Sequence, residues 1–290
     1  MIRDPFAPLL RKQRLQDRLL RLGRTLGRSL RPSRLAPRRE GPPNLVLVGV
    51  DTWRRDHLGG GLTPHLDALA GGGVDFADVT APAPWTLPSF AGALTGLMPS
   101  RHGAQLTGVV RNMDTQPPQR LAAGTVTLAR HLAGRGYATA ALYANQFFAF
   151  GLAESFGEHR YRNLPAAAIL AEGAEWIRRH ADRPFCLFVL LNDPHEPTTP
   201  ADAFLRPQLA ALDLAPPSVE ELRQLASWGD PDRPEAHLGY CGWPLPAAAE
   251  RVRRLKRAVY RATIAQVDQA LGRFVARLDR WGLHQNTLFT

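Results

Sequence analysis

The chain has 290 residues, of which 44% are hydrophobic, and its formal net charge is +10. This length and composition support one sizeable α/β domain. Its two cysteines, Cys186 in an apolar run and Cys241 in a proline-rich segment, do not indicate a disulfide framework. No apolar run has the length of a signal-peptide core or a membrane span, so export by the general secretory route and membrane insertion lack support. We therefore expect a cytoplasmic protein, with peripheral membrane association as an open alternative.

The positive charge is concentrated in residues 1–40, which hold twelve Lys or Arg and three acidic residues. Leucines recur there at helical spacing between arginines, which predicts a basic amphipathic helix ahead of a short linker. Such a helix binds an anionic membrane surface, a partner protein, or nucleic acid without sequence preference, and a solvated extension is the alternative. We expect residues 1–43 to be an extension and linker, and residues 44–290 to be the domain.

The first predicted strand covers residues 44–50, a short β-branched apolar run typical of a buried parallel strand. Asp51 follows this run directly, and Asp56 comes five residues later. Open α/β sheets keep their sites at the C-terminal ends of their strands. Asp51 is therefore a candidate site residue, and Asp56 is a weaker candidate that lies nearby.

Thr86 stands where a proline-rich irregular segment, residues 81–84, gives way to a predicted helix. Its hydroxyl is expected at the positive end of that helix, where unpaired N–H groups attract anions. Thr86 is therefore the candidate nucleophile. For this segment on its own, a plain helix-capping role is the alternative.

The second half of the chain continues the α/β pattern. A buried strand is predicted over residues 185–191, and the polar pair Asp193 and His195 follows it. We assign Asp193 to a turn, and a loop histidine held between prolines is the alternative for His195. Residues 198–246 are rich in proline and predict a long insertion over the site. The last predicted elements are a helix over 247–281 and a strand that begins at 286–290.

Six segments, in order, resemble the sulfatase family of the alkaline phosphatase superfamily. They are residues 48–59 (first metal-binding strand end), 63–79 (next helix and strand), 83–103 (nucleophile signature), 127–145, 183–197 and 261–289. The resemblance covers residues 44–290. It implies an alkaline-phosphatase-like three-layer α/β/α fold with a mostly parallel central sheet, truncated at the C-terminus, so that this chain is the amino-terminal part.

The resemblance also implies a divalent metal ion, whether calcium, zinc, manganese or magnesium. It makes Asp51 and Thr86 the metal ligands, with Thr86 also the nucleophile, and matches His195 to the family's substrate-facing histidine. The metal is needed because a threonine hydroxyl is a very weak acid whose alkoxide must be stabilised. His195 would donate a hydrogen bond to the anion or protonate the leaving oxygen.

Three departures from the family pattern stand out. Thr86 occupies the position where sulfatases carry a cysteine or serine that matures to formylglycine. A threonine at this position resembles the phosphotransferase and phosphodiesterase branches of the superfamily. Phe90 replaces the arginine that ends the nucleophile motif. The strand at 286–290 is not followed by the family's Ser-Asp-His-Gly segment, so we expect the C-terminal metal ligands to be missing.

The leading hypothesis is a sulfatase-like, metal-dependent hydrolase of sulfate esters or phospho(di)esters with a threonine nucleophile, incomplete as written. The expected partners are small-molecule, lipid or glycan esters, together with an anionic membrane surface contacted through residues 1–40, and no specific nucleic acid. The alternative hypothesis is a non-catalytic truncated remnant that acts through its basic N-terminal helix as a membrane- or partner-binding module.

Overall fold

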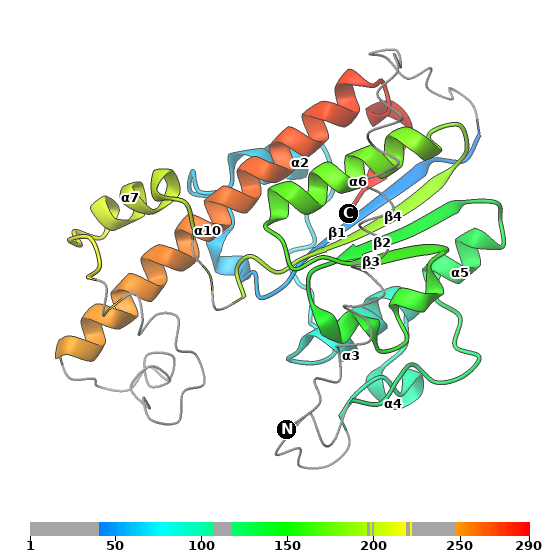
Figure 1. The fold of residues 1–290 in the computed structure, drawn as a ribbon, viewed down its shortest axis with the longest axis horizontal. Coiled ribbons are helices and arrows are strands. Elements are labelled where there is room, and N and C mark those ends of the chain that lie inside the picture. Colours follow the sequence, from blue (N-terminus) through cyan, green and yellow to red (C-terminus); the bar gives the residue numbers. More distant parts are fainter. Residues whose placement is uncertain (1–40, 107–117, 196–197, 199, 219–220, 222–246) are drawn as a thin grey trace, which may run out of the picture.

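The computed structural model describes residues 41–106, 118–195, 198, 200–218, 221 and 247–290. These residues form a three-layer α/β/α arrangement, with helices on both faces of a central sheet (Figure 1). The predicted α/β fold class is confirmed. The amphipathic helix predicted over 1–40, Cys241 and most of the predicted insertion lie outside the described residues.

All strand pairs in the described residues are parallel, and the sheet order is β3-β2-β4-β1-β5. The strands are β1 (Asn44–Val50), β2 (Ala138–Tyr143), β3 (Glu158–Tyr161), β4 (Phe185–Leu191) and β5 (Thr287–Phe289). In the centre of the sheet, Leu45 of β1 is opposite Cys186 of β4. Because the pairing is parallel, the carboxyl ends of these strands meet at one edge, where a site was expected.

Two groups of helices cover the two faces of the sheet (Figure 1). On one face lie α6 (Ala166–His180) and the long α10 (Ala247–Arg280), with α2 (Pro64–Gly71) and α7 (Asp202–Ala211) against α10. On the other face lie α3 (Thr86–Thr95), α4 (Pro99–His102) and α5 (Leu128–Ala133). Short 3-10 turns complete the described elements: η1 (Arg55–His57), η2 (Gln146–Ala149), η3 (Ala153–Ser155) and η4 (His284–Asn286).

The sheet separates two apolar cores, and β4 supplies both of them. Leu187 and Val189 belong to the core under α6 and α10, whereas Phe188 and Leu190 belong to the core under α3 and η2. Successive side chains of a strand point to opposite faces, so a strand covered on both sides is apolar throughout. This explains why the run Phe185–Leu191 is buried at every position.

The helix that carries Thr86 has clear local boundaries. Trp85 is extended, with φ −152° and ψ 166°, and the helix begins at the next residue. It ends at Gly96, whose φ of 70° is the left-handed conformation that glycine adopts without steric cost. Thr86 is therefore the first residue of α3, as the sequence predicted.

The strand expected within 63–79 is the main correction to the predicted elements. The helical part is present as α2, but residues 74–79 form no strand, and the side chains of Val74, Phe76 and Val79 are 73–75% exposed. A strand needs a neighbour to complete its hydrogen bonds, and among the described residues this segment pairs with none.

The helices of the described residues also bear on the question of membrane insertion. None of them combines the length and the apolar character that crossing a bilayer requires.

Candidate functional site

Polar residues follow three neighbouring strands of the sheet. Asp51 comes directly after β1, Asn145 follows β2, and Asn192 comes directly after β4. Because β2, β4 and β1 are adjacent and parallel, their ends lie side by side. The first turn of α3 brings Thr86 to the same place, where its hydroxyl contacts Asp51.

Thr86, Asp51 and Asn145 form one hydrogen-bonded group, which we call the Thr86 cluster. The Thr86 Oγ1 hydroxyl donates to Asp51 Oδ2 at 2.7 Å. The Asn145 Nδ2 amide donates to the same Asp51 oxygen at 2.8 Å and to Thr86 Oγ1 at 2.9 Å. Thr86 is 6% exposed and Asn145 is 7% exposed, so these bonds are sheltered from water. The Thr86 hydroxyl thus bonds Asp51 and Asn145, which follow β1 and β2. No side-chain hydrogen bond caps the start of α3.

The orientation of the Asn145 amide follows from its second contact. Asn145 Oδ1 accepts a hydrogen bond from the Phe147 backbone N–H at 3.0 Å, which caps the short turn η2. Its Nδ2 group therefore faces Asp51 and Thr86, with a weaker contact to Asn192 Oδ1 at 3.4 Å. Sequence reasoning missed Asn145, although the same strand-end rule that selected Asp51 applies to it.

Asp51 is held by a backbone contact to β4 and is followed by an unusual turn. Its N–H donates to the Leu191 carbonyl at 2.9 Å, which continues the ladder between β1 and β4. The next residue, Thr52, has a φ of 59°, a conformation that costs a non-glycine residue about 1–3 kcal/mol.

Tyr260 on α10 braces the same turn from the helix layer. Its hydroxyl donates to the Thr52 carbonyl at 2.7 Å and accepts from the Arg54 N–H at 2.8 Å. Tyr260 therefore fixes the unusual turn that follows Asp51.

Asp56, the weaker sequence candidate, makes its own contacts away from the Thr86 cluster. Its carboxylate accepts from Arg54 Nε at 2.9 Å and Arg54 Nη2 at 2.6 Å, and it also contacts His57 Nδ1 at 2.9 Å. The Arg54 guanidinium, with a further contribution from His57, holds the pKa of Asp56 well below its usual range. Asp56 is 59% exposed in this ion pair. The structure therefore gives Asp56 a surface ion pair and no contact with Thr86.

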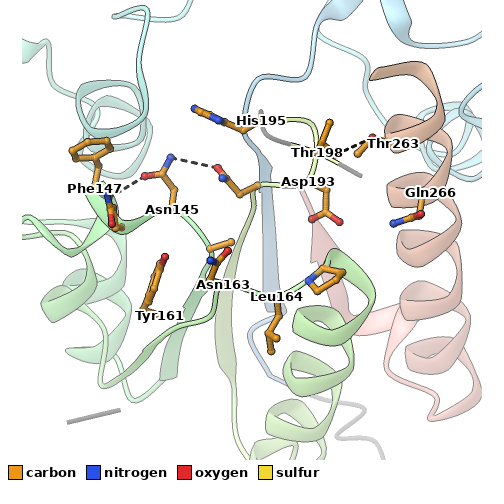
Figure 2. A pocket seen from close by; sticks show the side chains of 14 residues that line it. Asn145, Phe147, Tyr161, Asn163, Leu164, Asp193, His195, Thr198, Thr263 and Gln266 are labelled. Atoms are coloured by element: carbon orange, nitrogen blue, oxygen red, sulfur yellow. Dashed lines mark hydrogen bonds between the residues drawn. The ribbon is translucent and has the colours of Figure 1, made fainter. Parts of the chain in front are cut away.

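His195 lies at the rim of an open cavity of about 540 Å³ beside the Thr86 cluster (Figure 2). Asn145 and Asn192 line the same cavity, and the His195 N–H donates to the Asn192 carbonyl at 3.0 Å. The neighbouring Asp193 accepts from the Ala166 N–H at 2.9 Å, at the start of α6, and burial raises the pKa of its carboxyl. The assignment of Asp193 to a structural turn thus agrees with its contact.

Phe90 occupies the place where the family pattern has an arginine, and it belongs to the apolar core. Its ring packs edge-to-face on Phe188, with the ring centroids 5.8 Å apart. It also fills the space above Gly49 of β1, where a Cβ atom would lie 2.5 Å from Phe90 Cε1. Gly49 and Phe90 therefore fit each other, and this position supplies packing and no positive charge.

Three of the described side chains carry oxygen atoms that could hold a divalent cation. Asp51 contributes a carboxylate, Thr86 a hydroxyl and Asn192 an amide oxygen, which are the hard oxygen donors that magnesium and calcium take. The Nδ2 side of Asn145 faces this group as a hydrogen-bond donor. Among the described residues no three His, Cys, Asp or Glu side chains come together. The described donors thus fit a hard cation in kind and are too few to enclose one.

Comparisons with known proteins agree with this architecture. A mouse steryl-sulfatase is 43% identical over 115 residues, which is 38% of this chain and 18% of that protein. The solved phosphonate monoester hydrolase of Agrobacterium radiobacter superposes with a TM-score of 0.58 at 21% identity, covering 86% of this chain and 61% of that one. An alkaline phosphatase superfamily protein from Vibrio parahaemolyticus gives a TM-score of 0.52 at 17% identity, covering 90% and 57%.

These shares mean that the chain spans about a fifth of the mouse relative and about three fifths of the two solved proteins. At such low identity the solved structures establish the fold alone. The Sulfatase family model matches residues 43–290, which is nearly the whole of the described part. The chain therefore belongs to the sulfatase family.

Proposed function

We propose that the domain is a hydrolase of sulfate or phosphate esters in which Thr86 is the nucleophile. The observation that carries the proposal is the 2.7 Å hydrogen bond from the Thr86 hydroxyl to Asp51, with Asn145 donating to both oxygens. A nucleophile paired with a proton acceptor, and held by a third group, is the arrangement that hydroxyl-based group transfer needs. The family match supports the reaction class.

In the proposed reaction, the Thr86 oxygen forms a bond to the sulfur or phosphorus atom while Asp51 takes the hydroxyl proton. The bond between that atom and the leaving oxygen breaks, and His195 supplies a proton to the leaving oxygen, which departs as an alcohol. Asn145 keeps a donor on the Thr86 oxygen while negative charge develops there, and such charge-assisted bonds are the stronger ones. A water oxygen then bonds to the sulfur or phosphorus atom and gives one proton to His195, while the bond from that atom to the Thr86 oxygen breaks and Asp51 returns its proton to that oxygen.

Members of this superfamily generally use divalent metals, and the oxygens of Asp51 and Thr86 are the ones we assign to such an ion. The metal, whether calcium, zinc, manganese or magnesium, would lower the pKa of the hydroxyl and take up charge on the transferred group. Because Phe90 brings no cation, the chain's own contributions are the proton acceptor and the amide donor.

The choice between sulfate and phosphate is also part of the proposal. One relative is named as a steryl-sulfatase and another as a phosphonate monoester hydrolase. A threonine nucleophile favours phosphorus, because sulfatases of the family use a formylglycine made from cysteine or serine. We therefore expect phosphate esters to react faster than sulfate esters.

Residues 1–40 are proposed to contact an anionic membrane surface. The proposal rests on the alternation of leucine and arginine in the sequence, since each basic residue adds about 1 kcal/mol near a negative surface. Co-sedimentation with anionic vesicles should be lost when residues 1–40 are deleted, and equal sedimentation of the shortened protein would remove the proposal. The family match over residues 43–290 favours the hydrolase over a remnant that acts through this helix alone.

The hydrolase proposal is tested by kinetics on 4-nitrophenyl phosphate and 4-nitrophenyl sulfate, with each of the four metals. Thr86→Ala and Asp51→Asn should reduce turnover to background, because each removes a partner of the central hydrogen bond. Asp56→Asn is the matched control, since it changes a nearby aspartate that belongs to a surface ion pair, and its turnover should stay within about twofold of the parent. Turnover that survives Thr86→Ala would refute the proposed nucleophile.

A further inference from the structure

The cavity beside the Thr86 cluster is large enough to hold the part of an ester that leaves in the reaction. It has a volume of about 540 Å³, within the range of small-molecule sites, and opens at the carboxyl ends of the strands (Figure 2). We propose that it binds the alcohol part of the ester, and that this part is an uncharged group rich in hydroxyls, such as a sugar ring. The inference rests on the proposed function, because it names the group that leaves when Thr86 attacks.

Side-chain amides dominate the polar lining of the cavity. Asn145, Asn163, Asn192 and Gln266 all line it and come from four different parts of the fold. An amide offers both donors and an acceptor, and so does a sugar hydroxyl, so the two match without any charge. Such a lining can bond several hydroxyls at once, which gives specificity for a polyhydroxylated ring.

Gln266 on α10 shows how one of these amides is oriented. Its Oε1 atom accepts a hydrogen bond from the Ala201 N–H at 2.8 Å. Its amide nitrogen points into the cavity (Figure 2). Asn145 is oriented in the same manner on the opposite wall, because its Oδ1 atom is held by the Phe147 N–H. The Gln266 donor is thus fixed before any ligand arrives, which lowers the entropy lost on binding. The Asn145 donor already bonds Asp51 and Thr86, so Asn145 shapes its wall of the cavity.

Two aromatic rings, those of Phe147 and Tyr161, lie on the Asn145 side of the cavity (Figure 2). The Phe147 ring is braced edge-to-face by Trp85, with the ring centroids 5.7 Å apart. A sugar ring has apolar C–H faces between its hydroxyls, and an aromatic ring offers those faces a flat apolar surface with little entropy to lose. Amides with nearby aromatic rings therefore suit an amphipathic ring better than they suit a flexible chain.

The charge of the lining excludes other classes of leaving group. Among the described residues that line the cavity there is no Lys or Arg, and the carboxylate Asp193 is engaged by the Ala166 N–H. A leaving group with a second negative charge would find no fixed positive partner. A sterol or a plain aryl group would cover the amides without bonding them, which leaves buried polar groups unpaired and weakens binding.

The test is a binding measurement on the full chain, which does not depend on turnover. The ligands are glucose 6-sulfate, 4-nitrophenyl sulfate and estrone sulfate, which share one sulfate, and methyl glucoside, which has none. Isothermal titration calorimetry should give the tightest binding for glucose 6-sulfate, by about tenfold over the other two sulfates, the equivalent of one or two hydrogen bonds. Methyl glucoside should bind weakly, and equally to the parent and to Thr86→Ala.

Gln266→Leu keeps the size of the side chain and removes its amide, so glucose 6-sulfate affinity should fall about tenfold. Gln208→Leu is the matched control, because Gln208 bonds Arg261 outside the cavity, and its affinity should match the parent. Equal binding of the three sulfates, or an unchanged affinity in Gln266→Leu, would overturn the inference. If Thr86 turns over aryl esters while the glucosides do not bind, the inference fails and the proposed function stands. Sugar binding without any turnover would refute the proposed function and leave the cavity as a sugar-binding site.

Discussion

The carboxyl ends of the central strands and the segment 74–79 both carry strand-like sequence, yet they differ in the structure. In the central strands, residues such as Leu187 and Val189 are 0% exposed, and the polar groups that follow the strands bond one another. At the second place, Val74, Phe76 and Val79 are 73–75% exposed in irregular backbone. The difference teaches that an apolar pattern forms a strand only where a neighbouring strand completes its hydrogen bonds and a helix layer buries its side chains.

The contacts that hold the two regions also differ in their exposure to solvent. The Thr86 cluster consists of sheltered bonds between residues from three separate elements. The 74–79 segment is tied by the ion pair of Asp75 with Arg55, at 2.7 Å, in which the two side chains are 49% and 53% exposed. An exposed pair of this kind contributes about 0–1 kcal/mol. Substitutions in the central strands and the Thr86 cluster should therefore reduce stability or turnover more than substitutions in the 74–79 segment.

Leu187→Ala should give the largest loss of stability. Leu187 is fully buried in the core under α6, and shortening it leaves a cavity between the sheet and that helix. We expect the free energy of unfolding to fall by about 2–5 kcal/mol, measured by urea denaturation. A loss below about 1 kcal/mol would mean that this face of the sheet is loosely packed.

Asn145→Ala should come second. The substitution removes the donor to the half-buried Asp51 carboxylate and the buried Thr86 hydroxyl, which costs about 1–3 kcal/mol. Urea denaturation measures the stability, and turnover of 4-nitrophenyl phosphate measures the function. Loss of turnover with unchanged stability would show that the amide acts on the reacting oxygen alone, and no change in either would remove Asn145 from the site.

Tyr260→Phe should have a smaller effect. It removes the hydroxyl that bridges the Thr52 carbonyl and the Arg54 N–H, so stability should fall by about 0.5–1.5 kcal/mol. Because Thr52 then loses its support, turnover should fall further than stability alone explains. Tyr137→Phe removes a single exposed bond to the Pro43 carbonyl and serves as the control, with stability and turnover close to the parent. Equal behaviour of the two variants would contradict the bracing role of Tyr260.

Phe76→Ser should have the smallest effect, because the Phe76 ring is already 74% in solvent. The free energy of unfolding should change by no more than about 0.5 kcal/mol in the same denaturation experiment. A loss above about 1 kcal/mol would show that residues 74–79 are packed in solution and that their comparison with the strand ends is wrong.

The sequence allowed much of this architecture to be predicted. The strands at 44–50 and 185–191, the helix start at Thr86 and the long helix ending before Gly282 all lie where the local patterns placed them. Each is set by short-range features, namely apolar runs, prolines and a closing glycine. The strand that the family resemblance implied within 63–79 is wrong, because strand formation depends on a partner strand, and among the described residues this segment has none.

The candidate site was only partly predictable. The rule that strand ends carry sites selected Asp51, and the helix start selected Thr86. The Asn145 contacts depend on β2 and β1 both flanking β4, a fact of sheet order. Tyr260 on α10 bonds Thr52 and Arg54, which lie more than 200 positions earlier in the chain. Such contacts follow from the folded arrangement and leave no signal in residue spacing.

The central claim, that Thr86 attacks the ester, is tested most directly by trapping its covalent intermediate. The chain is incubated with 4-nitrophenyl phosphate and a divalent metal, quenched in acid, digested and mapped by mass spectrometry. We predict one phosphoryl group on the peptide that contains Thr86, retained in Asp56→Asn and absent from Thr86→Ala and Asp51→Asn. An unmodified Thr86 with each of the four metals, or a phosphoryl group on another residue, would contradict the account.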